Sequence, residues 1–192
     1  MKNKVRAGFA LCGSYCTFEK AIEQMARLAR ENYDLYPILS EKSASEDTRF
    51  GAAADFRARI EEICGKNAVT TMQEAEALSR TLDVLVIAPC TSATLARLAQ
   101  GLSDSVVSFC AKGVLRGEKP VVLAVSTNDA LGASAPNIGA LLTRRGFYFV
   151  PFAQDDPEGK PRSALADFSL LPETLELALS SRQLQPILRA TC

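Results

Sequence analysis

Three short polar segments carry the side chains of this sequence that are best suited to hold a ligand. Each follows a run of apolar residues, and they span Gly13 to Thr17, Pro89 to Thr94 and Ser126 to Asp129. They offer hydroxyl, amide and backbone N–H groups, which are donors that fit an anion such as a phosphate. The alternative for each segment is a plain connection between a strand and a helix. The agreement of three segments favours a binding site.

In the first segment, Gly13 and Ser14 stand between an apolar run and an amphipathic pattern. A strand, a Gly-Ser turn and a helix start favour an anion, because free N–H groups and the helix dipole point at it. Only one glycine is present, so neither a GxGxxG fingerprint nor a P-loop pattern exists. Ser40 and Ser43 follow the second apolar run and could offer hydroxyls to a phosphate at the same edge of the sheet.

The other candidates are a thiol, an amide and charged groups. Cys90 follows a buried apolar run, and we expect a structural role; the alternative, a reactive thiol, needs a neighbouring base that the sequence does not identify. Asn128 and Asp129 are expected to make polar contacts with a ligand. Arg49 is a lone cation in a polar loop, and the alternative for it is simple solvation. Asp104 is expected to cap the helix that follows it.

The composition excludes several classes of site. There is no histidine, which removes Ser-His-Asp and Cys-His catalysis and histidine-ligated metals. The six cysteines form no CxxC pair, so we expect reduced, mostly buried thiols and no metal site. The 22 basic and 22 acidic residues balance, which argues against nucleic acid and anionic membranes as partners. No apolar run approaches the length of about 20 residues that a membrane span needs.

The hydrophobic pattern predicts the elements that must position these segments. Strands and helices alternate along the chain, which predicts an α/β fold of one domain over 1–192. We expect a doubly wound parallel sheet in a Rossmann-like three-layer sandwich of about six strands, in the order 3-2-1-4-5-6, with the ligand in the crevice between the first and fourth strands. A polar loop or lid is expected at 153–162. The expected strands are 5–11, 33–39, 68–70, 82–88, 120–125 and 147–152.

The same segments are similar to motifs of the flavoproteins of the flavin-containing cysteine decarboxylase type. APCTSATLARLAQGLSD resembles their AP-x-T-x-N-T-x-A-K-x-A-x-G-x-x-D stretch, and GSYCTFEK resembles their first-loop G-S-x-x-x-x-K. STNDALGASAPNIGALLTRRGFYFVP is similar to their segment with P-x-M-N and a final V-P. Within the family, PILSEKSASEDTRFG and YFVPFAQDDPEGKP resemble the subunits that take part in dipicolinate formation during sporulation. The resemblance runs from about Val5 to Ile187.

The resemblance implies FMN as the ligand and a homo-oligomeric, cytoplasmic protein. It also implies a second, A-type subunit that binds NAD(P) and oxidises a dihydrodipicolinate precursor to dipicolinate. A planar aromatic dicarboxylate calls for basic partners. We expect these to be Arg49, Lys112 and Arg116, and we expect Asp129 to make a further polar contact. No catalytic residue is assigned. The residues expected to bind the cofactor are Gly13, Ser14, Ser40, Ser43, Pro89, Cys90, Thr91, Ser92, Thr94 and Asn128.

Two departures from the family pattern keep alternatives open. The family's decarboxylases use a histidine, which this chain lacks, so an FMN-dependent decarboxylase is the weaker reading. The family places an amide side chain where this chain has Ala93, and the loss of one polar contact costs about 1 kcal/mol, roughly five-fold in affinity. The chain is therefore expected either to be an oxidoreductase subunit with a weakened hold on FMN, or to be a non-catalytic flavin-binding or scaffolding subunit.

Overall fold

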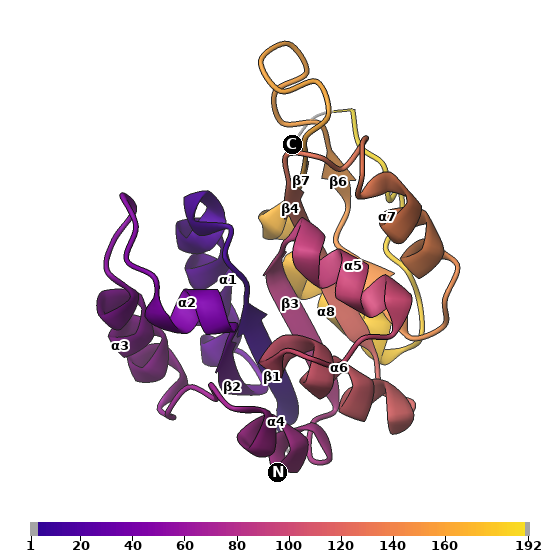
Figure 1. Cartoon of the computed structure of the whole chain (residues 1–192). Helices are drawn as coiled ribbons and strands as arrows, with labels where there is room; N and C mark the ends of the chain where they lie inside the picture. The colour runs from indigo at the N-terminus through magenta and orange to yellow at the C-terminus, as the bar shows by residue number, and fades with distance from the viewer. Residues whose placement is uncertain (1–3, 191–192) are drawn as a thin grey trace.

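A parallel sheet forms the centre of the computed structural model, which describes residues 4–190 (Figure 1). Its strands follow the order β2-β1-β3-β4, and β5 pairs with β4. Cys192, one of the thiols expected to be reduced, lies outside the described residues. The strands are β1 (Val5–Leu11), β2 (Tyr33–Leu39), β3 (Val84–Cys90), β4 (Val121–Thr127) and β5 (Phe147–Phe149).

The central strand β3 is buried along its whole length. All seven residues of VLVIAPC are buried, as are the first six of β4. A strand of a parallel sheet that is covered on both faces has no polar side, which explains the continuous apolar run in the sequence. Burial of each large aliphatic side chain contributes about 1.5–3 kcal/mol, so this strand fixes the middle of the fold.

Helices cover both faces of the sheet. One face carries α1, α3 and α8; the other carries α4, α5, α6 and α7 (Figure 1). Two short elements, η1 (Tyr15–Thr17) and α2 (Glu41–Ser45), follow β1 and β2. The longer helices are α1 (Phe18–Arg30), α3 (Ala53–Cys64), α4 (Met72–Ser79), α5 (Ser92–Gln100), α6 (Val106–Arg116), α7 (Ala135–Leu142) and α8 (Leu171–Leu179).

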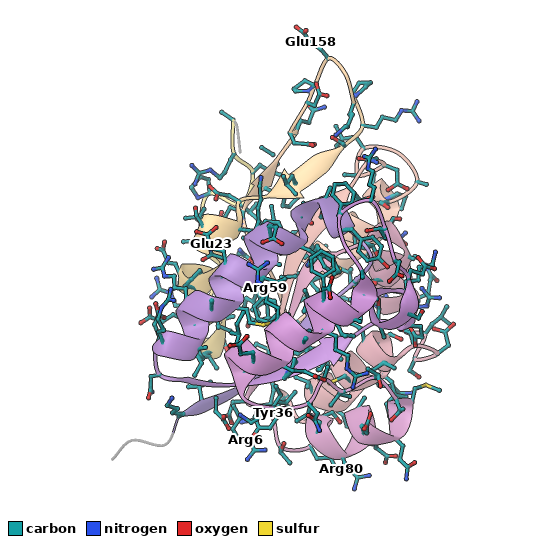
Figure 2. All side chains as sticks on the ribbon, turned by 90° about the vertical axis from the view of Figure 1, so that its left-hand side faces the viewer. Arg6, Glu23, Tyr36, Arg59, Arg80 and Glu158 are labelled. Carbon is teal, nitrogen blue, oxygen red and sulfur yellow. The ribbon has the colours of Figure 1, made fainter. Side chains whose placement is uncertain are left out.

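Figure 2 looks onto the face that α1 and α3 cover. The two helices pack through Phe18 and Phe56, whose rings meet edge to face with centroids 5.2 Å apart. An exposed ion pair between Arg59 and Glu19, at 2.7 Å, joins them at the surface. The apolar contact contributes most of the packing energy, because exposed ion pairs are worth little.

The predicted third strand at 68–70 is reduced to a single bridge. Val69 pairs with Ile38 on the outer side of β2, which is the place that the predicted order 3-2-1-4-5-6 gives it. The strand cannot extend because Thr71 already caps α4 through a capping box with Glu74. The α/β prediction is confirmed, and the order holds for the parallel strands.

The sheet is mixed rather than wholly parallel, because an antiparallel hairpin is added to the predicted parallel strands. The expected strand 147–152 divides into β5 and β6 (Phe152–Ala153) at Pro151, which has no N–H to donate to a ladder. The chain then returns through β7 (Ala164–Ala166), which pairs antiparallel with both β6 and the end of β4. The polar loop expected at 153–162 is the projecting turn of this hairpin, at the top of Figure 1, and Figure 2 labels Glu158 at its tip.

The helix cap expected at Asp104 is also wrong. The N-cap of α6 is Ser105, whose hydroxyl accepts from the N–H of Ser108 in a reciprocal capping box. Asp104 instead forms an ion pair with Arg97 at 3.0 Å. Among the described residues, no helix combines the length and the apolarity that crossing a membrane requires.

The contact between α4 and α6 leaves no room for a side chain at Gly113. A Cβ there would lie 2.6 Å from the Cβ of Ser79, whereas a Cβ at Gly139 on α7 would meet nothing within 4 Å. We expect Gly113→Ala to lower the free energy of unfolding by about 1–3 kcal/mol through overpacking. The control Gly139→Ala should raise it by about 0.5–1 kcal/mol through helix propensity. Urea denaturation measures both, and equal effects would contradict the close contact.

Candidate functional site

The polar segments meet in a cleft of about 510 Å³ at the carboxyl ends of the parallel strands. We call it the strand-end cleft. Its walls are the loop after β1, the start of α5 after β3, the segment after β4, and the β6–β7 hairpin. Ligands in open α/β sheets bind at this edge, and the volume lies within the range of about 300–1,000 Å³ that small-molecule sites occupy.

Hydroxyl groups hold the first loop against the end of β4. The hydroxyls of Ser14 and Ser126 lie 2.8 Å apart, and Thr17 Oγ1 lies 3.3 Å from the same Ser126 hydroxyl. Thr17 also donates to the carbonyl of Ser14 at 2.9 Å. Ser126 is only 5% exposed, so these bonds fix the start of η1 and α1 at the cleft. Thr17 and Phe18 donate their N–H groups to the carbonyls of Ser14 and Tyr15, so the N–H groups left for an anion are those at the start of η1.

The start of α5 forms a second wall. Thr91 is its N-cap, and the hydroxyl of Thr91 accepts from the N–H of Thr94. Thr94 is buried and donates its hydroxyl to the Sγ of Cys12 at 3.2 Å. Thr91 and Ser92 therefore face the cleft, while Thr94 links the helix start to the end of β1.

The charged groups of the cleft are two lysines and two aspartates. Lys160 lies 3.8 Å from Asp155 in an ion pair within the hairpin. The carboxylate of Asp129 accepts from the hydroxyls of Ser134, at 2.8 Å, and Thr127, so it stabilises its own turn. The side chain of Lys20 makes no hydrogen bond or ion pair with any other residue of 4–190. Lys20 is thus the cation that is free to meet an anion.

Thiols lie at and beneath the cleft in two different environments. Cys16 is exposed and lines it, with its Sγ 3.8 Å from the Ser14 hydroxyl. Burial raises the pKa of Cys12 to about 11, despite the Thr94 hydrogen bond that lowers it. Burial also raises the pKa of Cys90 well above its usual range. Both buried thiols stay protonated near neutral pH, in keeping with the structural role expected for Cys90.

The structure brings six of the fourteen predicted ligand residues to the strand-end cleft. These are Gly13, Ser14, Thr91, Ser92, Asn128 and Asp129. The other eight lie outside its lining: Pro89, Cys90, Thr94, Ser40, Ser43, Arg49, Lys112 and Arg116.

The uncharged residues outside the lining already have structural roles. Pro89 and Cys90 are buried in β3. Ser40 is the N-cap of α2, and its hydroxyl lies 2.9 Å from that of the buried Ser43. A sequence pattern locates residues near a strand end but cannot show which of them turn inward.

The three predicted cations do not meet at one site, because Arg49 lies apart from the other two. The guanidinium of Arg49 stacks on its neighbour Phe50, 4.9 Å from the ring centroid, in an exposed turn. Lys112 and Arg116 lie on α6 toward its C-terminus, which leads into the amino end of β4, at the opposite edge of the sheet. No single dicarboxylate can reach all three.

Sequence reasoning missed several residues of the cleft. Lys20 was within reach, because it is the last residue of the GSYCTFEK motif. Asp155 and Lys160 lie in the polar loop expected at 153–162, but the sequence did not place that loop at the cleft, because only the antiparallel pairing of β6 and β7 brings the hairpin there. The lining residues that were not named as ligand residues are Cys16, Thr17, Lys20, Ser126, Thr127, Asp155, Lys160, Ala164 and Leu165. Four of these lie within the predicted polar segments 13–17 and 126–129.

The family model described as Flavoprotein matches residues 1–143. The chain belongs to the flavoprotein family. This flavoprotein is 42% identical over 185 residues to the B-type subunit of dipicolinate synthase from Bacillus subtilis (strain 168), covering 95% of the chain and 92% of that protein. The resemblance expected from the motifs is thereby confirmed.

Solved structures agree with this assignment. The crystal structure of the B-type dipicolinate synthase subunit from Bacillus halodurans C matches the flavoprotein with a TM-score of 0.90 and 38% identity, over the whole of both chains. The FMN-dependent cysteine decarboxylase SpaF matches with a TM-score of 0.68 and 25% identity, over 93% of this chain and 97% of its own. Within residues 4–190, no group of three or more His, Cys, Asp or Glu side chains could hold a metal ion.

The difference between the thiols gives a direct test of the cleft. In the native flavoprotein at pH 8, we expect iodoacetamide to modify Cys16, which is exposed, and to spare Cys12 and Cys90. A thiol with a pKa near 11 is ionised in about one molecule in a thousand at that pH. Peptide mass mapping before and after urea unfolding measures this, with Cys16→Ser as the control. Modification of Cys12 in the native protein at the rate of Cys16 would contradict the buried position.

Proposed function

We propose that this flavoprotein is the B-type subunit of dipicolinate synthase in the cytoplasm of a sporulating cell. It binds FMN in the strand-end cleft and acts with an A-type subunit that binds NAD(P). Together they oxidise a dihydrodipicolinate precursor to dipicolinate. The observation that carries the proposal is the 42% identity to the B-type subunit of a dipicolinate synthase across 95% of the chain.

The donors of the cleft fit the phosphate and ribityl groups of FMN. Hydroxyls of Ser14, Thr17 and Thr91 lie beside two helix starts, and Lys20 adds a positive charge without a competing partner. This set suits a phosphate on one side and a polyol on the other. Bound FMN would supply a redox-active ring; the residues of this chain bind and orient it.

A dicarboxylate that binds in the cleft requires a cation among the lining residues. None of the three predicted cations lines the cleft, whereas Lys160 does so from the hairpin. We assign the carboxylate contact to Lys160, which would exchange its 3.8 Å ion pair with Asp155 for the ligand. The oxidation removes a hydride and a proton from the dihydropyridine ring; NAD(P)⁺ held by the partner would take up the hydride, and the proton would pass to water. The chain has no histidine, and the two carboxylates of the cleft, those of Asp129 and Asp155, already have hydroxyl or lysine partners, so no proton acceptor is assigned to this chain.

A non-catalytic scaffolding or flavin-binding subunit is the second candidate. Two features favour it: Ala93 is exposed at the first turn of α5 and has no polar side chain, and the buried thiols are protonated. In this case the chain shapes or stabilises the partner without taking part in the redox step. Decarboxylation is less favoured, because the histidine of the family's decarboxylases is absent.

Reconstitution separates these functions. The purified A-type subunit alone is expected to oxidise the dihydrodipicolinate precursor slowly, and addition of this flavoprotein should raise the rate. We expect Lys160→Ala to lower kcat/KM by about ten-fold through loss of a charged contact, while Lys4→Ala leaves it unchanged. NAD(P)H absorbance follows the reaction. Full activity of the partner alone would refute the proposal, and stimulation that is unaffected by Lys160→Ala would favour the scaffold.

FMN affinity tests the cofactor independently of the partner. We expect Lys20→Ala to weaken FMN binding by about five-fold through loss of a charge at the phosphate. Ala93→Asn should tighten it by about five-fold by restoring an amide contact. Quenching of flavin fluorescence measures both, with Lys4→Ala as the control. A colourless protein that binds no FMN even with Ala93→Asn would remove the cofactor from the proposal.

A further inference from the structure

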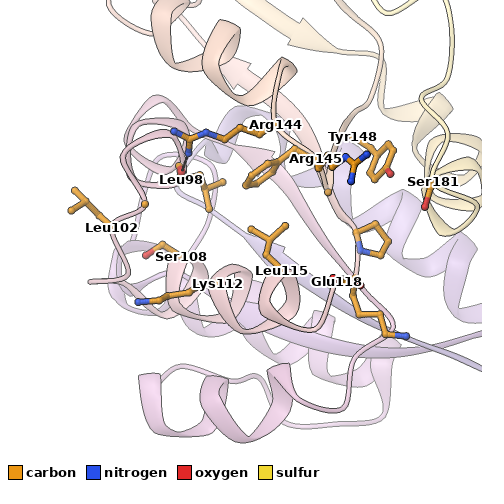
Figure 3. A pocket seen from close by; sticks show the side chains of 15 residues that line it. Leu98, Leu102, Ser108, Lys112, Leu115, Glu118, Arg144, Arg145, Tyr148 and Ser181 are labelled. Atoms are coloured by element: carbon orange, nitrogen blue, oxygen red, sulfur yellow. Dashed lines mark hydrogen bonds between the residues drawn. The ribbon is translucent and has the colours of Figure 1, made fainter.

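A second and larger cleft, of about 880 Å³, lies at the opposite end of the strands, beside the amino ends of β4 and β5 (Figure 3). We call it the α6–β5 cleft. Its lining includes the end of α5, one side of α6, the turn after α7 and the start of β5. It shares no lining residue with the strand-end cleft. A ligand here would therefore not compete directly with one bound at the strand ends.

The walls of the α6–β5 cleft are apolar and aromatic. Leu98 is buried and Leu115 half-buried, and the rings of Phe147 and Tyr148 are only partly covered. The rings stay open because β5 is the outer parallel strand; Gln183 covers its free edge only at Phe149, through bonds of 2.8 and 2.7 Å. An uncovered aromatic wall inside a concave site favours a flat apolar group as its occupant.

Positive charge surrounds this wall on several sides. Lys112, Lys119, Arg144 and Arg145 line the cleft, against a single carboxylate from Glu118. Figure 3 shows Leu115 between Lys112 on one side and the two arginines on the other. Cations on opposite walls converge on a compact anion, whereas a stripe of cations would follow an extended chain.

The cations of the cleft differ in whether they already have a partner within the protein. Arg144 donates to the carbonyl of Leu98 at 3.2 Å, and Lys119 lies 4.0 Å from Asp83. The side chain of Arg145 forms no hydrogen bond or ion pair with any other residue that the structure describes, and it lines the cleft together with Tyr148. An unpaired guanidinium next to an aromatic ring can bind a carboxylate or phosphate while the ring stacks on the rest of the ligand.

We propose that the α6–β5 cleft is a second binding site, for a small planar aromatic anion that carries carboxylate or phosphate groups. Arg145 binds the anionic group, and Tyr148 and Phe147 contact the ring. The volume fits a small molecule. This site is independent of the proposed function, since it needs neither FMN nor the partner subunit.

Calorimetric titration of the full chain tests the site with three probes. They are pyridine-2,6-dicarboxylate, adenosine 5′-monophosphate, and cis-cyclohexane-1,3-dicarboxylate as a dianion without an aromatic ring. We expect at least one aromatic probe to bind more tightly than the saturated one, and the better probe distinguishes a carboxylate from a phosphate ligand. Arg145→Ala should weaken that binding by about five-fold or more. Arg116→Ala, on the same side of the sheet but outside the lining, should not.

Separate variants distinguish this site from the strand-end cleft. Binding that Lys160→Ala weakens and Arg145→Ala leaves intact belongs to the strand-end cleft and overturns the proposal. Failure of both aromatic probes to bind below about 10 mM, or equal weakening by Arg116→Ala, also overturns it. Light scattering of Arg145→Glu provides a further check: a change in oligomeric mass would mean that another copy of the chain covers the cleft. Unchanged FMN affinity in Arg145→Ala supports two separate sites.

Discussion

The complete burial of β3 is the constraint on which the rest of the structure depends. Seven consecutive residues without a polar side require helices on both faces of the sheet. The strand ends where the polar residues that follow it reach solvent. At that point Thr91 both caps α5 and lines the strand-end cleft. The strand-end cleft is therefore a consequence of how the core ends.

Hydroxyl groups, rather than ionisable ones, organise the strand-end cleft. Ser126 joins the loop after β1 to the end of β4, across more than a hundred residues of sequence. Asp129 is held by Ser134 and Thr127, and the thiols beneath are protonated. Such a site is well suited to binding an anion and poorly suited to moving protons. This is why the proposed function gives the chain a binding and orienting role and leaves the hydride acceptor to the partner.

The two clefts lie at opposite edges of one sheet and differ in chemistry. The strand-end cleft is lined by small hydroxylated residues with balanced charge, whereas the α6–β5 cleft has aromatic walls and an excess of cations. The strand-end cleft forms where the carboxyl ends of the strands meet the starts of helices. The α6–β5 cleft forms at the amino ends, beside the partly covered outer strand β5. Lys112, expected from sequence to bind a dicarboxylate, belongs to the second of these.

The sequence by itself determined the parallel core and the position along the chain of the polar segments that line the strand-end cleft. Local periodicity sets strands and helices, so β1 and β2 were predicted with their observed bounds, and the three polar segments were placed at strand ends. Only the tertiary structure decided which side chains line the cleft. Inward or outward direction depends on caps and long-range bonds, such as the one between Thr94 and Cys12. The antiparallel hairpin that brings Lys160 to the cleft was also decided at this level, because its short strands are stabilised by their partners rather than by any local pattern.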